Sequence, residues 1–152
     1  PEYMQSLNIP AGTTTEAIMT ATMNDILHKV LGEGEWLKAY ANQQIYLNDT
    51  LLAEKGKTKT DIFNILYEPL MKMNGVAYVL EINDLSSATL NQDVKEFVIN
   101  GIYPKRCGDI QILYDPYWFE AYRKEGTTHG SHFSYDTHVP LVFFGWQVAP
   151  GT

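Results

Sequence analysis

The chain has 152 residues, and its 45% hydrophobic content is enough to bury the core of one domain, which we expect over residues 1–152. Its 18 acidic residues outnumber 11 basic ones, and the net charge of −7 disfavours binding to nucleic acid or to an anionic membrane. No apolar run approaches the roughly 20 residues that a membrane-spanning helix needs, and the single cysteine excludes a disulfide within the chain.

The first half of the chain predicts two long amphipathic helices with a strand between them. The first helix follows a capping box of Thr13 and Glu16 and ends at Gly32. A strand is expected over residues 44–47, and a short helical piece over 51–55. The apolar positions of the first helix form its expected buried stripe: Ile18, Met19, Ile26, Leu27, Val30 and Leu31.

Thr58 is the expected cap of the second helix, with Asp61 in its first turn. Pro69 is expected to kink this helix near its end. The buried stripe of the helix should consist of Ile62, Ile65, Leu66 and Leu70.

In the second half, residues 76–82 and 109–114 predict strands, with a helix over 91–100 between them. The helix should turn Val94, Phe97 and Val98 inward and end before Gly101. A last strand is expected over residues 139–144. This order of elements predicts an α+β fold whose helices lie on one face of a mostly antiparallel sheet.

Three of the four histidines, His129, His132 and His138, lie close together just before this last strand. Loops that lead into rigid strands often present a neutral imidazole to a metal ion. Gly130 and Ser131 favour a loop here, and no His-Glu-x-x-His pattern is present. From these residues alone, a metal site and an ordinary surface loop both remain open.

Residues 126–145, which include Gly-Thr-Thr-His-Gly-Ser and Tyr-Asp-Thr-His-Val-Pro-Leu-Val-Phe-Phe-Gly, resemble the metal-loop signature of the alkaline phosphatase superfamily. The similarity is strongest to the phosphate-irrepressible alkaline phosphatases of bacteria and extends to type I phosphodiesterase and nucleotide pyrophosphatase relatives. Residues 8–12, 74–79 and 105–110 agree with the same family in the same order. Within the last of these, Cys107 stands where the family has serine, which indicates a small half-buried side chain without special thiol chemistry.

This resemblance implies roles for three residues of the loop. His129 is the expected zinc ligand, and His138 is a weaker candidate because relatives often have arginine there. Asp136 is the candidate acceptor for the second ring nitrogen of the ligand histidine. Relatives hold two zinc ions with further Asp and His ligands and use a Thr or Ser nucleophile, and this chain has no Asp-His pair.

We therefore expect a C-terminal fragment of an α/β alkaline phosphatase-like enzyme, with residues 1–125 as scaffold and 126–145 as the metal loop and strand. The resemblance implies a bacterial, periplasmic or secreted hydrolase of small phosphate monoesters. The fragment alone should be inactive, because one ligand cannot assemble a catalytic zinc site and the nucleophile is absent. The alternatives are a phosphodiesterase, nucleotide pyrophosphatase or sulfatase of the same superfamily, and a non-catalytic α+β binding module.

Overall fold

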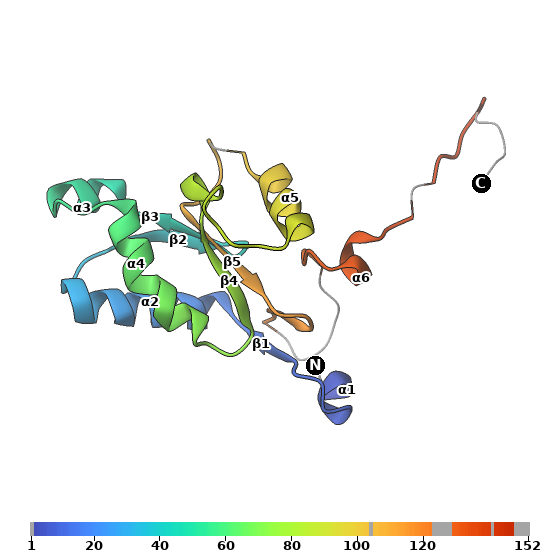
Figure 1. The fold of residues 1–152 in the computed structure, drawn as a ribbon, viewed down its shortest axis with the longest axis horizontal. Helices are drawn as coiled ribbons and strands as arrows, with labels where there is room; N and C mark the ends of the chain where they lie inside the picture. The colour runs from blue at the N-terminus through green and yellow to red at the C-terminus, as the bar shows by residue number, and fades with distance from the viewer. Residues whose placement is uncertain (1, 104, 123–128, 141, 148–152) are drawn as a thin grey trace.

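The structure is a computed structural model that describes residues 2–103, 105–122, 129–140 and 142–147. It combines helices with two small sheets (Figure 1). The helices are α1 (Glu2–Ser6), α2 (Glu16–Leu31), α3 (Asp49–Glu54), α4 (Lys59–Met71), the 3-10 turn η1 (Ile82–Asp84), α5 (Gln92–Gly101) and α6 (Ser134–Thr137). The strands are β1 (Gly12–Thr14), β2 (Leu37–Ala41), β3 (Gln44–Leu47), β4 (Val76–Glu81), β5 (Ile110–Tyr114) and β6 (Trp118–Glu120).

The main sheet has four strands in the order β2-β3-β5-β4, and every neighbouring pair is antiparallel. Strand β5 comes late in the sequence but lies between β3 and β4, so it joins the two halves of the chain. A second, two-stranded sheet pairs β1 with β6 in parallel, with Gly12 opposite Trp118. The predicted combination of helices with a mostly antiparallel sheet is confirmed.

Helices cover both faces of this sheet. On one face, α2 and α4 pack on β2, β3, β4 and β5, while α5 packs on the other face of β4 and β5 (Figure 1). Successive residues on these strands are apolar. Val79 belongs to a first core, which the sheet forms with α2 and α4, and Leu80 belongs to a second core, which it forms with α5. Because successive strand side chains point to opposite faces, both faces need cover. The expectation that all helices lie on one face is therefore wrong for α5.

The first core places large side chains from α2, α4 and the central strands together. Along α2 and α4 the buried residues recur every three or four positions, as one face of a helix requires. The fully buried side chains of this core are Met19, Met23, Leu27, Trp36, Ile45, Ile62, Leu66, Leu70, Ile110 and Ile112.

The start of α2 differs from the prediction. The side chain of Thr15, not Thr13, caps the helix and accepts a hydrogen bond from the Ile18 amide at 3.2 Å. Thr13 lies in β1, where pairing with β6 holds it extended. The predicted stripe is also partly wrong, because Ile18 is 54% and Val30 60% exposed. The predicted helix end at Gly32 is confirmed.

Helix α4 begins as predicted, with a reciprocal capping box between Thr58 and Asp61. Pro69 lies inside this helix, which ends two residues later at Met71. In α5, Val98 is buried but Phe97 is 45% exposed, so the expected inward position of Phe97 is wrong. Gly101 is the last residue of α5 and not the residue after it.

The strand expected over residues 139–144 is not formed by the residues of this range that the structure describes. Val139, Val142, Phe143 and Phe144 are each more than 70% exposed, and the segment after α6 runs away from the sheet in Figure 1. A strand needs a neighbour to pair its amide and carbonyl groups, and within the described ranges no strand lies alongside this segment. The apolar sequence of this segment therefore predicts a strand for which the described residues provide no pairing partner.

Candidate functional site

The histidine-rich loop brings two of its predicted residues together. The carboxylate of Asp136 in α6 accepts a hydrogen bond from the Ser131 amide at 2.6 Å. This bond holds the pKa of the Asp136 carboxyl below its usual range, and the nearby His129 acts in the same direction. His129 and Asp136 thus interact electrostatically.

The other two histidines have different surroundings. The ring of His132 is half-buried, with its centroid 4.1 Å from that of Phe133 and 6.2 Å from that of Phe97. Burial lowers the pKa of His132 and so favours its neutral imidazole. His138 follows α6, is exposed, and donates its backbone amide to the Ser134 carbonyl at 3.0 Å.

His129 and His132 line a cavity of about 750 Å³. Its wall combines this loop with the turn after β2, with β6 and with α1, so it is assembled from segments distant in sequence. A smaller cavity of about 230 Å³ shares both histidines and lies against α5. His138 is not among the described residues that line either cavity, so the structure separates the weaker metal candidate from the stronger one.

Within the described residues, no three His, Cys, Asp or Glu side chains gather as a metal site would require. His129 nevertheless supplies a donor type that suits zinc, an imidazole nitrogen. A zinc ion at His129 would therefore need further ligands from elsewhere.

A hydrogen-bonded network that the sequence did not reveal borders the large cavity. Glu120 of β6 accepts hydrogen bonds on one carboxylate oxygen from the phenols of Tyr40 and Tyr114, the latter at 3.0 Å. The two phenol oxygens are 3.1 Å apart. Tyr40 and Tyr114 belong to the main sheet, so this network fastens β6 to it. Burial raises the pKa of both phenols above the usual value for tyrosine.

The raised phenol pKa values predict that the protein loses stability in alkaline solution. Above pH 10, the unfolded chain releases phenol protons that Tyr40 and Tyr114 retain when folded, so the free energy of unfolding falls as pH rises. Tyr40→Phe should make this fall shallower in urea titrations between about pH 8 and pH 11. Tyr103→Phe, which alters an exposed tyrosine, is the matched control and should keep the wild-type slope. An equal slope in the Tyr40 variant would contradict the prediction.

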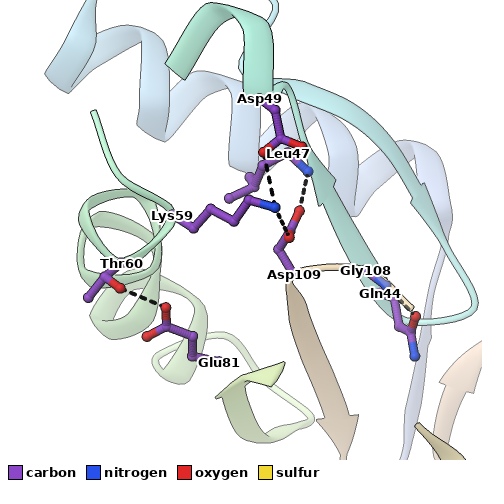
Figure 2. Close-up of polar contacts among 8 residues, drawn as sticks. All are labelled: Gln44, Leu47, Asp49, Lys59, Thr60, Glu81, Gly108 and Asp109. Atoms are coloured by element: carbon purple, nitrogen blue, oxygen red, sulfur yellow. Dashed lines mark hydrogen bonds and ion pairs between the residues drawn. The ribbon is translucent and has the colours of Figure 1, made fainter. Parts of the chain in front are cut away.

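A second network holds the segment before β5 (Figure 2). Asp109 accepts hydrogen bonds from the Lys59 ammonium at 2.6 Å and from the Leu47 amide at 2.8 Å, and Lys59 also contacts Asp49 at 3.0 Å. Burial alone would lower the pKa of Lys59, but the hydrogen bonds to Asp109 and Asp49 outweigh it and raise that pKa. The network connects the N-terminal ends of α3 and α4 with β3 and β5.

Cys107 lies beside this network and is half-buried, as expected. Its sulfur accepts a hydrogen bond from the Tyr103 amide at 3.0 Å. A serine hydroxyl can accept the same bond, so this contact is compatible with the serine that the resemblance leads us to expect here. The next residue, Gly108, donates its amide to the Gln44 side chain at 2.8 Å (Figure 2).

Comparison with known proteins identifies relatives that match most of this chain. No family model matches the chain. A protein of Myroides odoratus named calcium-transporting ATPase is 36% identical over 85% of the chain and 24% of its own length. Alkaline phosphatase PafA of Elizabethkingia meningoseptica is 35% identical over 98% of the chain and 27% of its own length.

The crystal structure of wild-type alkaline phosphatase PafA superposes on 98% of the chain with a TM-score of 0.86 and 34% identity. The match covers 28% of that structure, so the chain spans about a quarter of the length of its relatives. In the described ranges, no helix has the length and apolar character needed to cross a bilayer. The extent of the sequence match and the agreement of the folds show that the chain belongs to the alkaline phosphatase superfamily and represents part of such a protein.

Proposed function

We propose that this chain is part of a zinc-dependent alkaline phosphatase that hydrolyses phosphate monoesters, with His129 as one zinc ligand. The carrying observation is that His129 and Asp136 line the same large cavity and belong to the loop whose sequence resembles the metal loop of the family. In this proposal one imidazole nitrogen of His129 binds the metal, and Asp136 accepts a hydrogen bond from the N–H group of the other nitrogen and fixes the ring orientation. Residues 1–125 then act as the scaffold for the metal loop and strand of 126–145.

The remaining parts of the site belong to residues outside this chain. Catalytic zinc sites use three protein ligands, and the described residues bring no such set together. The further Asp and His ligands, the second zinc site and a Thr or Ser nucleophile would come from the rest of the enzyme. When bound, the two zinc ions would supply positive charge that stabilises the transferring phosphoryl group.

The same proposal covers substrate and location. The substrate is a small phosphate ester, and the net charge of −7 does not favour nucleic acid as a specific partner. The enzyme would act in the periplasm or outside a bacterial cell. Phosphodiester or sulfate ester hydrolysis is the alternative within the superfamily, because the choice depends on groups outside this chain.

The test compares full-length protein with its His129→Ala variant in zinc content and in hydrolysis of an aryl phosphate. We expect the variant to lose one zinc ion and about a hundredfold or more in kcat, because a direct ligand is removed. His138→Ala should keep both zinc ions, since His138 lies apart from the cavity. Unchanged zinc and activity in the His129 variant would contradict the proposal.

Two further samples sharpen this comparison. His28→Ala removes a histidine of α2 that hydrogen-bonds the Gly34 carbonyl at 2.9 Å, and it should leave zinc content and activity unchanged. The 152-residue chain alone should show no metal-dependent turnover, because it lacks both the nucleophile and enough ligands. Turnover by this chain, once host phosphatase is excluded, would overturn the assignment of the nucleophile to the rest of the enzyme.

A further inference from the structure

The charged groups among the described residues that line the 750 Å³ cavity are mainly acidic. Three carboxylates, Glu16, Glu120 and Asp136, line it, and none of its described lining residues is lysine or arginine. Burial lowers the pKa of the lining His132, which favours its neutral form. A cleft lined by groups of one charge sign concentrates ligands of the opposite sign. The described carboxylates of this wall therefore attract a cationic group.

Aromatic rings line the same cavity. Tyr117 and Tyr135 are stacked, with ring centroids 5.6 Å apart and planes inclined by 10°. The Tyr122 hydroxyl donates a hydrogen bond to the Glu16 carboxylate at 2.8 Å, and both residues also line the cavity. Aromatic rings together with carboxylates bind ammonium groups, because an uncovered, electron-rich ring face attracts a cation. Tyr135 stacks on both Tyr117 and Phe133. The ring of Tyr122, which is 72% exposed and hydrogen-bonded to Glu16, is therefore better placed to meet a cation.

The cavity also has a size that suits a small molecule, and one of its carboxylates is held in a fixed position. Its volume of about 750 Å³ lies within the range of roughly 300 to 1,000 Å³ that is typical of small-molecule sites. In its wall, hydrogen bonds from Tyr40 and Tyr114 fix the Glu120 carboxylate, so this charge is held in place before a ligand binds.

We propose that this cavity binds an organic cation with an ammonium head group. If the proposed phosphatase function holds, the ammonium belongs to the alcohol part of the phosphate ester, because His129 lines the same cavity. Hydrolysis of such an ester breaks the bond between phosphorus and the ester oxygen. Water supplies the new oxygen of the phosphate, and the amino alcohol leaves with a proton on its hydroxyl group.

Binding of choline and of its neutral carbon isostere, 3,3-dimethyl-1-butanol, to the 152-residue chain tests the cation site. The two probes have the same shape and differ in charge. We expect choline to bind at least about tenfold more tightly, as followed by NMR titration of the tyrosine ring signals. Equal affinity, tighter binding of the alcohol, or no binding of choline would overturn the proposal.

Charge-removing variants locate the site. Glu120→Gln should lower choline affinity about tenfold and leave binding of the alcohol unchanged. Because Glu120 accepts bonds from two buried phenols, this variant can fail to fold, and Glu16→Gln is then the deciding one, since its hydrogen bond is exposed. Glu68→Gln, which alters an exposed carboxylate of α4 paired with Lys72, is the matched control. Equal loss of choline affinity in the Glu68 control would place the binding elsewhere and contradict the proposal.

Failure of the cation site and failure of the phosphatase function give different results. Choline binding needs neither zinc nor a nucleophile, so its absence leaves the zinc and hydrolysis test untouched. In an active full-length enzyme, phosphocholine should have a lower KM than the phosphate ester of 3,3-dimethyl-1-butanol, and Glu16→Gln should remove that difference. If the 152-residue chain bound choline but the active enzyme showed no difference in KM between the two esters, the cation site would stand. That result would contradict only the proposal that the ammonium belongs to the leaving alcohol.

Discussion

Replacing Gly75 with alanine should destabilise the protein by about 3 kcal/mol, through a clash in the core combined with backbone strain. Gly75 precedes β4 with a φ of +85°, and a Cβ atom there would lie 2.1 Å from the Trp118 ring. The ring has little freedom to move, because a Cβ atom on Gly12 would also lie within 2.5 Å of it. Urea unfolding followed by circular dichroism measures the loss.

Two controls separate the clash from the strain. Gly32 has a φ of +84° and open space around its missing Cβ, so Gly32→Ala carries a backbone cost without a clash. We expect Gly75→Ala to lose clearly more stability than Gly32→Ala. In a Trp118→Leu background the cost of Gly75→Ala should shrink, because the ring that the methyl group meets is gone. Equal costs in both backgrounds would show that Trp118 is not the obstacle.

The sequence predicts the parts of this fold whose signals are local. The Thr58 and Asp61 capping box spans three residues, and β4 and β5 each consist of one short run rich in β-branched and other apolar side chains. The hairpin turn at Asn42 and Gln43 was not predicted. Both residues have positive φ values, 50° and 63°, but no glycine marks the turn in the sequence.

Much of the candidate site depends on contacts that no spacing pattern reveals. Resemblance to a family singled out His129 and Asp136, and both residues line the same cavity. The Glu120 network, in contrast, joins residues 74 and 80 positions apart, so only the folded sheet brings them together. For residues 139–144 the sequence instead predicts a strand that is not formed. An apolar run indicates a strand even where the described residues offer it no pairing partner.

Asp109→Ala should lower the free energy of unfolding by about 2 kcal/mol. The Asp109 side chain is 15% exposed and accepts bonds from both the Lys59 ammonium and the Leu47 amide (Figure 2). Its removal leaves a backbone donor of the sheet without this acceptor. The Lys59 side chain is 36% exposed, so solvent screens part of the lost ion pair and keeps the expected cost below that of a fully buried one.

A second variant divides this cost between the two bonds. Asp109→Asn keeps a side-chain oxygen for the Leu47 amide but removes the charge that faces Lys59, so it should cost less than Asp109→Ala. Glu68→Ala is the matched control, since its pair with Lys72 has both side chains more than 70% exposed and should contribute no measurable stability. If Asp109→Ala were as mild as this control, the network would not be what holds β5 against α4. If Asp109→Asn were as costly as Asp109→Ala, the charge facing Lys59, and not the bond to the sheet amide, would account for the stabilisation.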